Sequence, residues 1–427
     1  MMFDIRERAR ARLVGMAHGL ALVLAVAGLP ALASAQPLTL RQALALARES
    51  DVGLTASEAR IEAAAGALRQ AGASPNPSVG VDIENFPRTN FNVPFERTEA
   101  TLYYQRTLER GDKREARTNV ARADLEAVRL RRIVRGLDLF QNVETAWNEA
   151  VAAAAAVRIA EEQLAVLEGF QSEVRRRVEA ARDPLFAGAR VDTQVIQARI
   201  ALDQARVVAQ NARRALAAYW SNPSDQPLDA AEFENTNAEL PALPAQSIDV
   251  SLLEAQRETA DAQVSLERSR AVPDLTLRGG VRYIEQGRDL ALVVGGSIPL
   301  GIYDTNRGNI ERAEAERLAA DREIAAARLA RVRDTVRLQG RISANAAEAN
   351  RIQAEVLPKA EETVALVRDG FNRGGFSYLD VIDAQRALID ARVRRVEALK
   401  AFHTDRAALN RLAARHADLI PSEETRP

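Results

Sequence analysis

Long stretches of the chain place apolar residues at every third or fourth position. The longest covers residues 112–182 almost without a break and predicts a single helix. About 70 residues at roughly 1.5 Å each make a rod on the order of 100 Å long, which no globular domain requires. Asp183, Pro184 and Gly188 then predict a sharp turn, after which a second helix returns to about Trp220.

Four shorter stretches alternate apolar residues with polar or small ones, which is the pattern of a β-strand. They cover residues 79–84, 97–108, 275–284 and 290–300. Most have about ten residues, the length of a tilted strand that spans a membrane. An ordinary soluble hairpin is the alternative interpretation of each strand pair, and we favour the membrane strand because of this length.

The same order of elements occurs twice along the chain. In each half an Ala-rich helix leads to two strands and then to a long helical hairpin, and residues 174–206 align with 360–392 at an offset of about 186. In the second hairpin we expect Pro358 to bend the outgoing helix and Gly370 to Gly375 to form the turn. The predicted units are a first repeat at 36–220, a connector at 221–247, a second repeat at 248–420 and a C-terminal tail at 421–427.

The start of the chain follows a different pattern. Arg6, Arg8, Arg10 and Arg12 precede an apolar run over residues 20–32 that ends in small residues. This is typical of a secretory signal, so we expect residues 1–35 to be removed. A membrane anchor helix is the alternative, but the run is short for a span. No later segment approaches the roughly 20 apolar residues of a membrane helix, so a mature chain that crosses a membrane must do so as strands of a closed barrel.

Four strands in one chain cannot form such a barrel, because the smallest membrane barrels have eight. Their unpaired edges have to be closed by strands from other chains. Three chains would supply twelve strands. The pattern therefore predicts an oligomer and leaves the number of chains open.

Composition and charge exclude several classes of function. The chain is 47% hydrophobic but only 4% aromatic, and its 58 basic and 59 acidic residues nearly cancel, so nothing indicates nucleic-acid binding. There is no cysteine, which excludes thiol catalysis, Cys-ligated metals and a lipid-modified Cys anchor. Beyond the signal only His403 and His416 remain, thirteen residues apart; we interpret them as solvated or seam positions on different faces of a helix. We predict no catalytic set, no metal site and no cofactor.

Several short motifs carry a resemblance to a known family. Residues 38–412 resemble the TolC family of outer-membrane efflux proteins. The motifs that resemble the family as a whole are Pro75-Asn76-Pro77, Ile298-Pro299-Leu300, Asn306-Arg307-Gly308-Asn309 and the stretch from Gly375 to Arg386. Those most like its heavy-metal (CzcC-like) branch are Glu84-Asn85-Phe86 and the stretch from Thr107 to Arg114.

The resemblance implies a mainly α fold with a β part. Long antiparallel coiled-coil helices and four membrane strands per chain would assemble as a homotrimer, with a twelve-strand β-barrel joined to a periplasmic α-helical barrel. The chain would lie in the outer membrane of a Gram-negative bacterium, with a long periplasmic extension. It would conduct solutes passively, heavy-metal cations in our preferred interpretation, from an inner-membrane RND-type pump and a periplasmic adaptor (membrane fusion protein). A drug-efflux or type I secretion duct and a pore-free periplasmic coiled-coil structural protein are the alternatives, and an enzyme is not expected.

The helix turns farthest from the strands are the candidate sites, because in this family such tips close the tunnel and contact the adaptor. Carboxylates there could form charged rings in a symmetric pore, or could merely cap helices and pair with nearby arginines. The glycines either adopt positive φ or allow a close approach. The predicted tip residues are Asp183, Pro184, Gly188, Asp369, Gly370, Arg373, Gly374, Gly375, Ser377, Asp380 and Asp383.

Aromatic residues gather around the strands and suggest a membrane-interface belt, with packing inside a barrel as the alternative. They are Phe86, Phe91, Phe95, Tyr103, Tyr104, Tyr283 and Tyr303.

Overall fold

The computed structural model describes residues 37–85, 97–220, 226–237 and 239–420 of the 427-residue chain. The predicted signal (1–35), the tail (421–427), part of the connector and three of the aromatic residues, Phe86, Phe91 and Phe95, lie outside these ranges.

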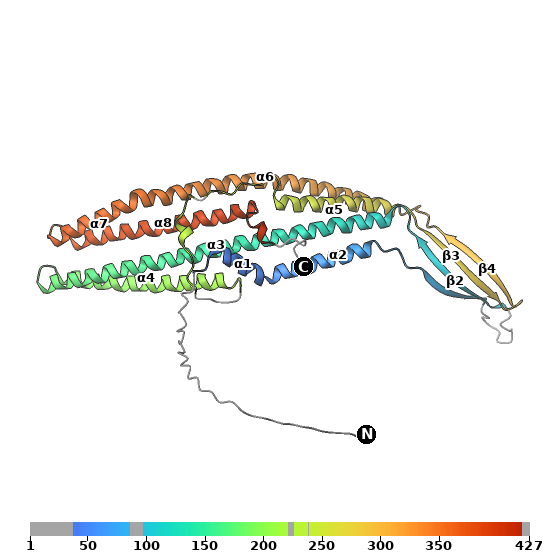
Figure 1. The fold of residues 1–427 in the computed structure, drawn as a ribbon, viewed down its shortest axis with the longest axis horizontal. Helices are drawn as coiled ribbons and strands as arrows, with labels where there is room; N and C mark the ends of the chain where they lie inside the picture. The colour runs from blue at the N-terminus through green and yellow to red at the C-terminus, as the bar shows by residue number, and fades with distance from the viewer. Residues whose placement is uncertain (1–36, 86–96, 221–225, 238, 421–427) are drawn as a thin grey trace, which may run out of the picture.

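Helices account for most of the chain and run along one axis, with a small sheet at one end (Figure 1). None of the helices in the described ranges is both long enough and apolar enough to cross a bilayer. The longest is α3, with 67 residues, as the uninterrupted helical pattern predicted. The α-helices are α1 (Leu40–Ser50), α2 (Val52–Ala71), α3 (Lys113–Glu179), α4 (Leu185–Ala217), α5 (Ile248–Arg270), α6 (Arg307–Arg351), α7 (Leu357–Asn372) and α8 (Tyr378–Leu412).

The sheet is antiparallel, with four strands in the order β1-β2-β3-β4. Its strands are β1 (Ser78–Glu84), β2 (Glu99–Leu108), β3 (Leu275–Ile284) and β4 (Asp289–Ser297). The central pair joins the two halves of the chain, since Leu102 of β2 lies opposite Val281 of β3. The edge strands β1 and β4 have no second neighbour among the described residues. The predicted strands are therefore confirmed, and they form one sheet with two open edges.

The two hairpin turns have the same backbone conformation. Ala181 and Gly374 are left-handed, with φ of 53° and 83°. In each turn the following residue donates its N–H to a carbonyl five residues earlier: Arg182 to Arg177 at 2.9 Å and Gly375 to Gly370 at 2.8 Å. This is the Schellman way of ending a helix. Gly374 follows Ala181 by 193 residues, seven more than the offset at which the flanking helices align in sequence. A heptad-like apolar pattern matches itself when it is shifted by seven residues, so the sequence alone cannot decide between these two alignments of the repeats.

Pro358 interrupts the second long helix, as predicted. A five-residue π-helical turn, Ile352–Val356, separates α6 from α7, and Pro358 lies in the first turn of α7. Proline lacks the N–H that an α-helix uses at this position, and its ring crowds the preceding turn. The wider π-helical turn accommodates both effects.

Four buried clusters hold the helices of the described ranges together. The largest lies midway along the molecule and contains Leu44, Phe140, Trp147 and Leu399. The second lies at the helical tips. Two smaller clusters lie between α8 and the second long helix, one around Leu357 and Leu388 and one around Phe402. Many of the buried residues are Ala, which is why a chain with so few aromatic residues can still pack.

Candidate functional site

The turns α3–α4 and α7–α8 lie together at the end of the molecule farthest from the sheet (Figure 1). Aromatic rings join them: Phe170 of α3 lies 5.2 Å from Phe371 of α7 and stacks on Tyr378 of α8 at 5.4 Å. The Tyr378 hydroxyl donates to Gln194 Oε1 of α4 at 2.6 Å. Burial raises the pKa of Tyr378 to about 12, so this hydroxyl stays protonated and keeps donating. The tips thus form one packed unit.

Arg177, near the end of α3, connects the two turns by polar contacts. Its Nε and Nη2 donate to the two carboxylate oxygens of Asp183 at 2.8 and 3.3 Å. Its Nη1 donates to the carbonyl oxygen of Phe371 at 3.2 Å, and its guanidinium lies 4.4 Å from the centre of the Phe371 ring. One side chain therefore holds its own turn and clasps the neighbouring hairpin. Arg177 was not among the residues that the sequence singled out.

The four candidate carboxylates of the tip have different surroundings. Asp183 is paired with Arg177, and Asp369 with Arg373 at 2.6 Å. Asp380 belongs to a capping box: it accepts from the backbone N–H and hydroxyl of Ser377, and these hydrogen bonds hold its pKa below the usual range. Asp383 is exposed and has no ion pair among the described residues. The capping and pairing roles weighed in the sequence hold for three of the four, while their action as charged rings stays a prediction.

The glycines also serve different purposes. Gly374 has positive φ, as a turn requires, and Gly370 has no side chain because one would collide with the Phe376 ring that covers it. Gly188 was expected in the first turn, but it lies inside α4. The reason is Pro184, which is the N-cap of α4 and starts the helix before Gly188 is reached.

The tips also expose a set of large apolar side chains that the sequence reasoning missed. Leu185 and Phe186 begin α4 and are 85% and 68% exposed; Phe376 and Leu379 flank the start of α8 and are half exposed. Monomeric proteins seldom gather such residues at a protruding end without a partner. The signal was present, since Leu185 and Phe186 directly follow the helix-starting Pro184.

The sheet presents one apolar face to its surroundings. Strand alternation places Val81, Leu102, Val281 and Leu292 on this face, and all four are exposed, Leu292 by 86%. We call it the apolar face; its remaining large members are Val79, Ile83, Tyr104, Leu277, Tyr283, Leu290 and Val294.

The predicted aromatic belt divides accordingly. Tyr104 and Tyr283 lie on the apolar face, but Tyr103 lies on the opposite face, because adjacent strand residues point to opposite sides. Tyr303 is 98% exposed in the segment between β4 and α6. The face that carries Tyr103 is polar, with Asp82, Glu84, Glu99, Asp289, Arg278 and Arg282 along its rows.

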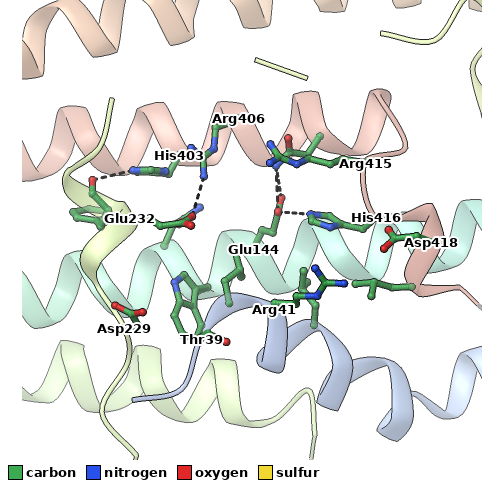
Figure 2. A pocket seen from close by; sticks show the side chains of 17 residues that line it. Thr39, Arg41, Glu144, Asp229, Glu232, His403, Arg406, Arg415, His416 and Asp418 are labelled. Carbon is green, nitrogen blue, oxygen red and sulfur yellow. Dashed lines mark hydrogen bonds and ion pairs between the residues drawn. The ribbon is translucent and has the colours of Figure 1, made fainter. Parts of the chain in front are cut away.

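A cavity of about 420 Å³ lies at mid-length, where α1, α3, α8 and the connector meet (Figure 2). Glu144 of α3, only 4% exposed, lies within 2.8 Å of His416 Nε2 and accepts from Asn410 Nδ2 at 3.2 Å. His403 Nε2 lies 2.9 Å from the carbonyl oxygen of Phe233. Burial lowers the pKa of His403 to about 4, so it is neutral and donates there.

The expectation that His403 and His416 point to different faces of one helix is wrong. Helix α8 ends at Leu412, and a left-handed Ala414 turns the chain back so that both histidines line this one cavity. Both are seam positions between elements, as expected. No group of three or more His, Asp or Glu residues able to hold a metal ion occurs within the described ranges. The cavity is thus a polar junction that ties the C-terminal segment to α3.

Comparisons with known proteins agree with this geometry. A family model described as outer membrane efflux protein matches residues 241–415. The cobalt-zinc-cadmium resistance protein CzcC of Cupriavidus metallidurans is 33% identical over 400 residues, covering 90% of this chain and 91% of CzcC. The nickel and cobalt resistance protein CnrC of the same organism is 29% identical over 73% of this chain and 72% of its own length. The crystal structure of the outer membrane protein VceC from Vibrio cholerae superposes with a TM-score of 0.69 at 20% identity, over 88% of this chain and 96% of VceC.

Proposed function

Since this chain belongs to the TolC family of outer membrane efflux proteins, we propose that three copies of it form one outer-membrane duct. Their twelve strands close a β-barrel, and their helices, arranged as two tandem repeats per chain, form a tunnel through the periplasm. The observation that carries this proposal is the sheet: its apolar face is exposed and both of its edges are open within the chain. Lipid would cover the apolar face, and strands of neighbouring copies would complete the edges.

The tips are the end at which such a duct meets its partners. We assign the exposed Leu185, Phe186, Phe376 and Leu379 to contact with a periplasmic adaptor, which in turn connects to an RND-type pump in the inner membrane. The contacts of Arg177 would then hold the two hairpin turns together at the tips. Among the carboxylates, Asp383 is the most available to line the pore, because Asp183, Asp369 and Asp380 are already engaged.

The names of the relatives indicate which solute this duct exports. CzcC and CnrC are named for resistance to cobalt, zinc, cadmium and nickel. We therefore assign heavy-metal cations to this duct as the exported solute.

Matched substitutions in β4 test the membrane assignment. Leu292→Asp puts a carboxylate on the apolar face, and Val293→Asp puts the same group on the polar face one residue later. A charge that faces lipid at the bilayer midplane costs about 2–4 kcal/mol for Arg or Lys and less for Asp, whereas a charge that faces an aqueous lumen is tolerated. We expect the first variant to lose heat-modifiable trimers from the outer-membrane fraction and the second to retain them. Equal behaviour of the two, or a freely soluble parent, would reject the barrel.

A deletion strain tests the solute. Loss of the gene, in a host without other metal pumps, should raise sensitivity to cobalt, zinc and cadmium, and the Val293→Asp variant should restore resistance where Leu292→Asp does not. Unchanged metal tolerance together with increased drug sensitivity would contradict the metal assignment.

A further inference from the structure

The polar face of the sheet carries four carboxylates and only two guanidinium groups. Asp82, Glu84, Glu99 and Asp289 lie on it with the two arginines of β3, Arg278 and Arg282. The face therefore has a formal charge of −2, where the carboxylates alone would give −4. The only other basic residue of the four strands, Arg106, lies on the apolar face.

Arg282 connects three acceptors on two neighbouring strands. It donates through Nη1 to Glu99 at 2.6 Å and through Nε to the Thr101 hydroxyl at 3.0 Å, both on β2. Its Nη2 lies 3.0 Å from Glu84 of β1. Two like charges that face each other across β1 and β2 are thus neutralised by one guanidinium that lies along the sheet.

Arg278 is held by stacking as well as by charge. Its guanidinium lies 3.4 Å from the centre of the Tyr103 ring and pairs with Asp82. The ring has room to lie flat because Gly80, opposite it on β1, has no side chain; a Cβ there would collide with the Tyr103 ring and hydroxyl. Arg278 and Arg282 are each only 31% exposed. Neither arginine can swing freely into the lumen.

The arrangement affects how ions would leave the duct. In a trimer, four uncompensated carboxylates per chain would place twelve carboxylates along the lumen, which attract cations but also retain divalent ones. Conduction needs attraction weak enough for release. Two fixed arginines halve the charge and leave Asp289, at the start of β4, as the one strand carboxylate of this face without an ion pair among the described residues.

We propose that Arg278 and Arg282 determine the ion preference of the barrel by neutralising its lining, so that cations are favoured without being trapped. This inference rests on the proposed trimeric barrel, in which the polar face lines the lumen.

The test is the reversal potential of purified protein in a planar lipid bilayer with a potassium chloride gradient. Arg278→Gln and Arg282→Gln each remove one positive charge per chain from the lumen, and Arg106→Gln removes the same charge from the opposite face. We expect the potassium-to-chloride permeability ratio to rise about twofold or more in the first two variants and to stay at the parent value in the third. Glu84→Gln, with the opposite sign, should lower the ratio.

The outcomes separate the two proposals. Two results with a channel-forming parent would overturn the role of Arg278 and Arg282 and leave the duct intact. In one, all three arginine variants keep the permeability ratio of the parent; in the other, Arg106→Gln shifts the ratio as much as the other two. A parent that forms no channel at all would overturn the duct and this inference with it. If one of the Arg278→Gln and Arg282→Gln variants fails to insert, the other decides: a raised ratio supports the proposal and an unchanged ratio rejects it.

Discussion

Replacing Arg177 with Gln should loosen the helical tips without unfolding the rest of the chain. The substitution removes the paired hydrogen bonds to Asp183, the hydrogen bond to the Phe371 carbonyl and the stacking on the Phe371 ring. The mid-length core lies in a different cluster and does not involve these residues. The effect is therefore expected to be local.

The magnitude follows from how far these groups are shielded from water. The side chains of Arg177 and Asp183 are 21% and 16% exposed, so water screens their pairing only in part. Hydrogen bonds to charged groups contribute about 1.5–3 kcal/mol, and a partly exposed cation–π contact adds about 0.5–1 kcal/mol. These terms overlap in one side chain, so we expect a loss of about 2–3 kcal/mol. At 1.4 kcal/mol per tenfold change, the tips should open about 30- to 150-fold more often.

Hydrogen–deuterium exchange measures this opening directly. Peptides that cover residues 175–190 and 366–385 should both exchange faster in Arg177→Gln, because Arg177 connects the two hairpins. Arg182→Gln is the matched control, since Arg182 is an exposed neighbour without an ion pair among the described residues. Faster exchange confined to 175–190 would refute the clasp, and equal effects of the two variants would show that only net charge matters.

Three further predictions concern the caps, the mid-length cavity and the docking surface. Ser377→Ala should lower the stability of the start of α8 by about 1 kcal/mol, which faster hydrogen exchange of its first turn would show. In the parent, the stabilisation that Asp380 gives to this cap is fully present above the ordinary pKa of an aspartate and is lost as the pH falls through the lowered pKa of Asp380. Because the folded-state pKa of His403 is about 4, below its unfolded value, folding stability should decrease by on the order of 3 kcal/mol as the pH falls from about 6.5 to about 4, and His403→Gln should flatten this slope in thermal unfolding. Phe186→Ser should weaken binding of the cognate adaptor at least tenfold in surface plasmon resonance, and Asp369→Asn should leave it unchanged.

The elements of the fold could be predicted because their signals are periodic. The apolar spacing before residue 182 predicted α3, and the alternation around Leu102 predicted which side chains share a strand face. Pro358 predicted the interruption of the second rod. Such patterns can be recognised without knowledge of the tertiary contacts, since each depends only on the local periodicity of the chain. The register between the two hairpins was beyond reach for the same reason, because a pattern that repeats every seven residues fits itself at several offsets.

The roles of single polar residues were harder to predict. Whether Asp380 faces a pore or caps α8 depends on the exact residue at which the helix begins, and Ser377 sets that start. The contact between Glu144 and His416 joins positions 272 residues apart. No local pattern encodes either contact. Tyr103 shows the intermediate case: its face could be read from alternation, but its stacking with Arg278 depends on the strand pairing that brings Gly80 opposite it.

The geometry of the tips changes what kind of docking is expected there. Rings of pore-lining carboxylates were the first hypothesis. However, Asp183 and Asp369 are paired with arginines, and Asp380 accepts the hydrogen bonds that cap α8. Groups already paired within the chain gain little from a new partner, because a new ion pair would replace an existing one. The features left unsatisfied at this end are apolar, above all Leu185 and Phe186. Burial of apolar surface depends only weakly on ionic strength, whereas exposed ion pairs are screened by salt. Docking at these tips should therefore persist at high salt, and charge should serve to orient the adaptor more than to hold it.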